Sequence, residues 1–365
     1  MNQLDRRRPL PQGAPVVPES VGTLRLEYRR TQRRRRSGLA ALLAVLLWAV
    51  LTDLGLGATD IGAGDILRAV GLPDTVDAQT RIVVQELRLP FTLMAVLVGA
   101  SLSLAGAEMQ TVLDNPLASP FTLGVSSAAS LGAALGFVLG LGLPGVPVEW
   151  LVSVNAFVFA FGSVLLLQAA TRAVAGNRHV LVLCGVAMVF TFNALVALLQ
   201  YVASPDALQQ LVFWSMGSFS RASWAKLQIM AAVLLLTLPF AMRAAWSLNV
   251  LRLGVPRARS LGLDVRGIQF WSLLRISVLA ATAVAFAGTI GFVGLVGPHI
   301  ARMLLGEDHR FLVPGSALVG ALLLSLASMA SKTLVSGAVL PIGIVTAIVG
   351  VPVLLWLIFR KGGRT

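Results

Sequence analysis

Long apolar runs separated by short polar segments dominate the chain from about residue 38 onward. A helix needs about 20 apolar residues to cross the ~30 Å hydrocarbon layer of a bilayer, and most of the runs approach that length. The runs lie near residues 38–57, 90–112, 121–143, 147–170, 180–203, 224–242, 268–288, 290–305, 311–331 and 339–359. The pattern predicts an all-α membrane protein with about ten transmembrane helices. The eighth is short and glycine-rich enough to be a half-span.

Composition agrees with a lipid-embedded chain. Of the 365 residues, 56% are hydrophobic and 12% are charged, and the mean hydropathy is +0.83. Because a soluble domain carries about 25% charged residues, a water-soluble core could not absorb this much apolar sequence. Cys184 is the only cysteine, which excludes an intrachain disulfide and a cysteine-rich metal site.

Basic residues are concentrated before the first apolar run. The formal net charge is +13, and ten arginines lie within residues 6–36. Such blocks can bind RNA, but a basic block beside a span is more typical of a cytoplasmic topology signal. We therefore expect no nucleic-acid partner. Residues 1–37 are predicted to form a flexible, cytoplasmic, arginine-rich segment, and residues 38–361 the membrane domain.

The loop charges predict the orientation. With a cytoplasmic N-terminus, the inner loops are basic and the first outer loop, residues 58–89, is mainly acidic, as the positive-inside rule requires. An even number of spans places the C-terminus on the cytoplasmic side as well. The longest inner loop, residues 244–267, contains Pro256 and an arginine-rich turn that Gly262 can end. We expect it to hold a short helix on which a soluble partner docks.

The sequence contains no recognisable arrangement of catalytic residues. No Gly-x-x-x-x-Gly-Lys-Ser/Thr loop is present to hold a nucleotide phosphate, and His179, His299 and His309 lack metal-ligand spacing. We expect a chain that is not an enzyme and binds no cofactor or metal of its own.

Two glycine series bear on helix packing. Gly132, Gly136 and Gly140 recur at four-residue spacing, which favours close helix contact in lipid. A second series recurs every third residue and is followed by proline: Gly288, Gly291, Gly294, Gly297 and Pro298. It is consistent with a tightly packed, kinked helix and equally with a helix broken beside a cavity.

A few polar residues within or beside the spans are candidate functional groups. Glu108 and Arg275 lie in apolar runs, where ionisable residues are functional candidates, although both could snorkel to an interface. Arg88 and Lys332 lie at predicted outer ends, where they could anchor to headgroups or receive an acidic protein.

Several ordered motifs resemble the FecCD family, the permease subunits of binding-protein-dependent importers for ferric siderophores, haem and vitamin B12. The resemblance spans residues 40–361. The motifs are Leu87-Arg88-Leu89-Pro90, Leu97-Val98-Gly99-Ala100, Gly106-Ala107-Glu108-Met109-Gln110, Asn115-Pro116-Leu117-Ala118, Leu123-Gly124-Val125-Ser126-Ser127, Ala258-Arg259-Ser260-Leu261-Gly262, the stretch from Gly291 to Arg302, and Leu340-Pro341-Ile342-Gly343-Ile344-Val345-Thr346.

This resemblance implies a type II ABC importer permease fold with ten spans and an inverted internal repeat. It also implies a second permease subunit, either a copy of this chain or a paralogue. Two cytoplasmic ATPases would bind ATP and Mg, and a periplasmic or lipid-anchored binding protein would deliver the cargo. The expected location is the cytoplasmic (inner) membrane of a bacterium. The expected function is import of an iron chelate, with ferric siderophores ranked above haem and vitamin B12.

The resemblance also assigns roles to individual residues. The expected ATPase-coupling residues are Arg257, Arg259, Ser260, Leu261 and Gly262. Arg88 and Lys332 match binding-protein docking positions, with Phe91 where a further arginine would stand. Asn115 and Leu117 match an inner gate, and Arg178 and His179 match a second gate region more loosely. A different class, a proton-coupled secondary transporter using Glu108, remains open.

Overall fold

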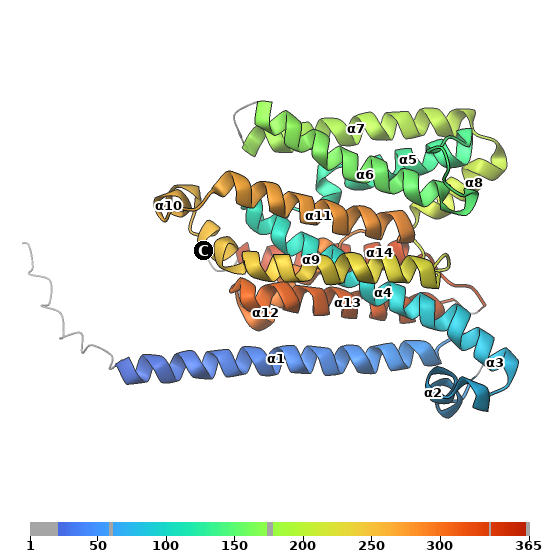
Figure 1. Cartoon of the computed structure of the whole chain (residues 1–365), viewed down its shortest axis with the longest axis horizontal. Coiled ribbons are helices and arrows are strands. Elements are labelled where there is room, and N and C mark those ends of the chain that lie inside the picture. Colours follow the sequence, from blue (N-terminus) through green and yellow to red (C-terminus); the bar gives the residue numbers. More distant parts are fainter. Residues whose placement is uncertain (1–20, 58–60, 174–177, 336, 363–365) are drawn as a thin grey trace, which may run out of the picture.

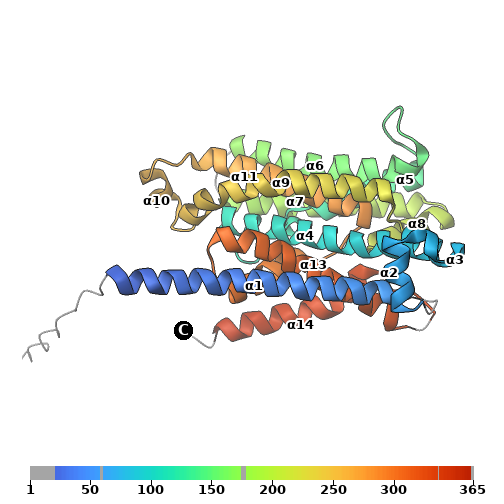
Figure 2. The same cartoon turned by 60° about the horizontal axis from the view of Figure 1, so that its bottom comes forward.

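The computed structural model describes residues 21–57, 61–173, 178–335 and 337–362, which contain helices and no β-strand. The long helices lie nearly parallel in one bundle, and the first and last described residues, Val21 and Gly362, lie at the same end of it (Figures 1 and 2). We call this the arginine end, because the arginines of the first helix and of the loop after residue 251 lie there.

Ten apolar helices correspond one by one to the predicted spans. They are α1 (Val21–Gly55), α4 (Leu89–Val112), α5 (Val125–Leu139), α6 (Val148–Ala173), α7 (Arg178–Val202), α9 (Trp224–Leu251), α11 (Val265–Ala287), α12 (Val293–Leu305), α13 (His309–Thr333) and α14 (Ile342–Gly362). Seven contain apolar segments long enough to cross a membrane, and the apolar parts of α5, α12 and α14 are shorter. The prediction of about ten spans, with a short eighth, is confirmed for the described residues.

Short helices cap the two ends of the bundle. At the end opposite the arginine end lie α2 (Ala63–Gly71), α3 (Ala78–Ile82) and α8 (Pro205–Ser215), whereas α10 (Val255–Ser260) projects from the arginine end (Figure 1). A π-helical stretch, Val83–Arg88, joins α3 to α4 without a break.

Two boundaries differ from the predicted ones. Helix α9 continues to Leu251 because Ala245 and Leu248 are still buried in the bundle, so the inner loop predicted over 244–267 shrinks to residues 252–264. Residues 21–37, predicted to be flexible, are the first half of α1. Residues 23–37 contain no glycine or proline and consist mostly of residues that favour helix, which explains why this segment is helical. Residues 1–20 lie outside the described part.

Helix α4 is the centre of the bundle and packs against α9, α11, α12 and α13. Its glycines allow backbones to touch: a Cβ on Gly99 would meet the backbone of Gly320 in α13, and one on Gly106 would meet the backbone of Gly294 in α12. Without the hydrophobic effect between helices in lipid, such close van der Waals packing is a main source of cohesion.

The first glycine series is confirmed as a packing face for two of its members. A Cβ on Gly132 would meet the backbone of Asn155 in α6, and one on Gly136 would meet Leu151 and Val152. Gly140 instead ends α5 with a φ of 62°. This left-handed conformation is inexpensive for glycine.

The second glycine series interrupts the helix, so that α11 and α12 are separate helices. Gly288 ends α11 with a φ of 75°, and α12 begins after Phe292 at a φ of 68°. The segment after α8 bonds to two neighbouring helix ends: Ser218 N–H donates to the Ala287 carbonyl at the end of α11 at 2.7 Å, and the Gly217 carbonyl accepts the Ile342 N–H at the start of α14 at 2.9 Å. Irregular backbone therefore occurs where protein covers it, as the broken-helix interpretation requires.

Candidate functional site

Helix α10 forms a small exposed platform at the arginine end. Ala258 is fully buried against Val250, Leu251 and Val265, which seats the helix on the ends of α9 and α11. Four of the predicted coupling residues point outward and are exposed: Arg257, Arg259, Ser260 and Leu261. Gly262 follows with a φ of 80°, which lets the chain turn at once into α11.

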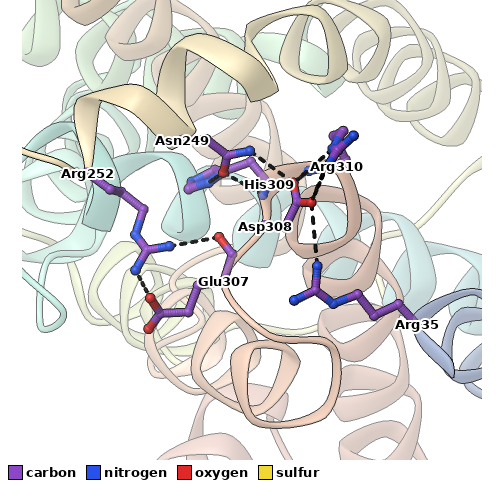
Figure 3. A network of polar contacts seen from close by, with 7 residues as sticks. All are labelled: Arg35, Asn249, Arg252, Glu307, Asp308, His309 and Arg310. Atoms are coloured by element: carbon purple, nitrogen blue, oxygen red, sulfur yellow. Dashed lines mark hydrogen bonds and ion pairs between the residues drawn. The ribbon is translucent and has the colours of Figure 1, made fainter. Parts of the chain in front are cut away.

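At the arginine end, a polar cluster connects α1, α4, α9 and α13, and Figure 3 shows its residues other than Thr111. Asn249, in the last turn of α9, donates its amide N–H to Asp308 Oδ1 at 2.9 Å and accepts the backbone N–H of His309 at 2.8 Å. The buried His309 ring contacts Asn249 Oδ1 through Nδ1 and Thr111 Oγ1 of α4 through Nε2, each at 2.8 Å. The α12–α13 turn is thereby held between α9 and α4.

Three arginines complete this cluster (Figure 3). Arg252 donates to the Glu307 carbonyl at 2.9 Å and pairs with the Glu307 carboxylate. Arg35 of α1 reaches Asp308 at 3.5 Å, and Arg310 reaches it at 2.7 Å. Burial alone would raise the pKa of Asp308, but hydrogen bonds from Arg310 and Asn249 outweigh it and lower the pKa to about 2. Asp308 is therefore ionised at neutral pH.

The predicted inner gate is an exposed loop after α4. Asp114 has a φ of 50°, and the Asn115 side chain accepts the backbone N–H of Leu117 at 2.9 Å, which forms a tight turn. Leu117 is 49% exposed. Arg178 and His179, at the start of α7, lie outside the residues whose side chains the structure describes.

Glu108 and Arg275 form one buried ion pair between α4 and α11. Arg275 donates Nε and Nη2 to the carboxylate at 3.1 and 2.7 Å, and Ser272 accepts a further bond at 2.9 Å. Glu108 is 1% exposed. Bidentate geometry and a third partner are what a desolvated pair needs to persist, so these residues do not snorkel.

At the opposite end, Arg88 lies beneath the end of α1. Its side chain donates to the carbonyls of Leu54 and Gly55 at 3.1 and 3.2 Å, and the residue is 6% exposed. These carbonyls lie at the C-terminal end of α1, where a cation is favoured.

Lys332 is part of a second buried pair. Its ammonium lies 2.9 Å from Asp53 Oδ1 and 4.8 Å from the centre of the Phe91 ring. Thr92 and Ser328 donate hydroxyls to the same carboxylate at 2.5 and 2.8 Å. Phe91 thus provides an aromatic face for the Lys332 cation.

Several of these residues were not predicted from the sequence: Asp53, Thr111, Asn249, Arg252, Glu307 and Asp308. Asp53 had a usable signal, because a carboxylate inside an apolar run is costly unless it is paired. The others lie at helix ends, where polar residues are common, and no local pattern marks them.

Comparison with known proteins connects this architecture to a family. The model of the FecCD transport family matches residues 43–360. The hemin transport system permease protein HmuU of Yersinia pestis is 38% identical over 321 residues, covering 88% of this chain and 96% of that protein. The vitamin B12 import system permease protein BtuC of Salmonella newport is 38% identical over 337 residues, covering 91% and 98%.

A solved structure shows the same fold. It is described as an inward-facing conformation of a metal-chelate type ABC transporter, and it matches with a TM-score of 0.78 at 31% sequence identity, covering 88% of this chain and 98% of that chain. The predicted fold class is confirmed by this match. With the family model covering most of the sequence and both relatives aligned over nearly their full length, the chain belongs to the FecCD transport family.

Proposed function

We propose that this chain is the permease subunit of an ABC importer and that α10 is where its ATPase docks. The observation that carries the proposal is the α10 platform, which exposes Arg257, Arg259, Ser260 and Leu261 while its one buried residue, Ala258, anchors it to α9 and α11. A rigid, exposed helix between two spans can transfer force from a soluble partner to the membrane domain.

The arginine end faces the cytoplasm in this proposal. Arg29, Arg30, Arg33, Arg34 and Arg36 of α1 are all exposed there, and the positive-inside rule places such residues on the cytoplasmic side. Both termini are then cytoplasmic, and the opposite end receives the binding protein. The protein resides in the inner membrane of a bacterium.

Transport in this scheme is alternating access by two permease subunits and two ATPases. ATP and Mg bind in the ATPases and favour one of the two conformations of the transporter. The shift in the conformational equilibrium is set by the difference in their affinity for the two conformations. This chain supplies the pathway, the platform and the gate loop around Asn115 and Leu117, and it catalyses no reaction itself.

The cargo is a metal chelate in this proposal. Hemin and vitamin B12 appear in the names of two relatives, and the matched structure is of metal-chelate type. All three descriptions are consistent with a metal ion held in an organic ligand. We rank ferric siderophores first, as the sequence resemblance does, and keep haem and vitamin B12 as alternatives.

A proton-coupled transporter is the second candidate function, and the Glu108 geometry argues against it. A carboxylate that takes up and releases protons needs a path to water, whereas Glu108 is 1% exposed and held by Arg275 through two nitrogens.

The α10 assignment predicts the effect of charge reversal at Arg259. Purified importer in liposomes should accumulate cargo with ATP, and Arg259→Glu should lower both ATP hydrolysis and uptake about tenfold, because it reverses the charge of the surface proposed to dock the ATPase. Arg266→Glu, an exposed change at the start of α11, is the matched control and should retain most activity. Uptake that ignores ATP would overturn the proposal.

The cargo assignment is tested by uptake in a strain that lacks the chain. Labelled ferric siderophores, haem and cobalamin are supplied separately, and the strain should lose uptake of a ferric siderophore while retaining the other two. Selective loss of haem or cobalamin uptake would transfer the assignment to that chelate.

Variants of the Asp53–Lys332 pair distinguish a role of Lys332 in binding-protein docking from a role in the stability of the protein. Lys332→Met should destabilise the protein by about 3–5 kcal/mol, because it strands the Asp53 carboxylate, and Asp53→Asn with Lys332→Met should recover most of this in thermal unfolding. If Lys332 also docks the binding protein, the stable double variant will bind it about tenfold more weakly. Exposed Arg81→Ala is the control for stability.

Glu108 is tested in the same way. Glu108→Gln should cost about 3–5 kcal/mol by leaving Arg275 buried without its carboxylate, and Glu108→Gln with Arg275→Gln should restore thermal stability. ATP-driven uptake should persist in the restored variant. Uptake that follows an imposed pH gradient and disappears in that variant would establish the proton-coupled alternative instead.

A further inference from the structure

One continuous chain of hydrogen bonds runs from the last turn of α9 to the last turn of α4. Asn249 binds Asp308 and the backbone of His309, and the His309 ring binds Thr111. We call these four residues the Asn249–Thr111 linkage. The His309 side chain is fully buried and Thr111 is 6% exposed, so water does not compete strongly for the bond between them.

The protonation of the linkage follows from its partners. Asn249 donates to a carboxylate and accepts a backbone N–H, which orients its amide group. The Asn249 oxygen carries no proton, so His309 Nδ1 must donate to it, and in the neutral imidazole Nε2 is then the acceptor. The Thr111 hydroxyl then donates to Nε2 and forgoes its alternative acceptor, the Ala107 carbonyl at 3.0 Å.

The two ends of the linkage adjoin the two places that must move together in an importer. Asn249 lies five residues before Gly254, the N-cap of α10, and the intervening residues form tight turns. Thr111 lies four residues before Asn115 in the gate loop. Between them, the α12–α13 turn is held a second time by Arg252 through Glu307 (Figure 3).

Capping alone does not account for this arrangement. Asp308 already caps α13 by accepting the Arg310 backbone N–H at 3.1 Å, and that contact needs neither Asn249 nor Thr111. The additional bonds connect three different helices. Directional bonds in a site of low water access resist relative displacement better than apolar contacts do, because breaking one leaves a buried group unsatisfied.

We propose that the Asn249–Thr111 linkage is a positioning element that transmits displacement of α10 to the gate loop after α4. The inference rests on the proposed function, since α10 must be the docking helix. Pushing on α10 moves the last turn of α9, and the α12–α13 turn and the end of α4 follow as one body. His309 is the connecting residue because its ring has a bonding nitrogen on either side.

The test uses the complete importer in liposomes and measures cargo taken up per ATP hydrolysed. Thr111→Val removes the hydroxyl and keeps the shape, and it should lower this ratio about fivefold, the factor that corresponds to a lost hydrogen bond of about 1 kcal/mol. ATP hydrolysis should change little, and the thermal unfolding temperature should fall modestly, because His309 Nε2 is left buried without its donor. Thr111→Ser keeps the hydroxyl and should restore the wild-type ratio.

Two further variants provide a control and an independent test of the linkage. Thr237→Val is the matched control, because its hydroxyl donates within its own helix to the carbonyls of Val233 and Leu234, and it should leave the ratio unchanged. Asn249→Ala should lower the ratio as Thr111→Val does. The two changes together should lower it no further, since residues in one network are not additive.

The outcomes separate this inference from the function on which it rests. Wild-type importer that takes up cargo with ATP, together with Thr111→Val that keeps the wild-type ratio, would overturn the linkage alone. A Thr111→Ser variant that behaves like Thr111→Val would also overturn it. Wild-type liposomes in which ATP drives no uptake would overturn the importer assignment, and the linkage with it.

Discussion

Charges removed from water must be paired within the chain, because lipid and apolar side chains cannot solvate them. Glu108 meets Arg275 between α4 and α11, and Asp53 meets Lys332 between α1 and α13. Each pair joins helices distant in sequence, and each is completed by hydroxyl groups of neighbouring residues. A small rotation of one of these helices would strand a charge, so the pairs restrict the bundle to a narrow range of arrangements. The close glycine contacts of α4 are compatible with that same arrangement.

The charge constraint and the packing constraint both act on α4. Its glycines approach α12 and α13, Glu108 attaches it to α11, and Thr111 attaches it to the α12–α13 turn. A helix held on several sides moves as a rigid body. This suits a transport subunit, in which displacement at one end must reach the rest of the bundle without being absorbed by local bending. The segment after α8 bonds to the end of α11 through Ser218 and Ala287 and to the start of α14 through Gly217 and Ile342, so this irregular backbone lies where protein covers it.

The two ends of the bundle differ in how they present charge. At the arginine end, cations of α1 and α10 are exposed and available to a partner. At the opposite end, Arg88 and Lys332 are buried and already bonded to the end of α1. Contact between either residue and an acidic partner therefore requires side-chain rearrangement. Phe91 contributes to this, because its ring lies against the Lys332 ammonium.

Hydrophobic run length by itself determined the ten spans and the short eighth, since crossing a bilayer demands a minimum number of apolar residues. Ordered motifs further identified the family. The sequence could not reveal that Glu108 meets Arg275, that Lys332 meets Asp53, or that Asn249 reaches Thr111 through His309, because each contact joins residues 60 to 279 positions apart. It also placed the end of α9 too early, since burial of Leu248 depends on neighbouring helices. Local pattern decides which segments enter the membrane; tertiary packing decides which polar groups meet there, because their partners come from other helices.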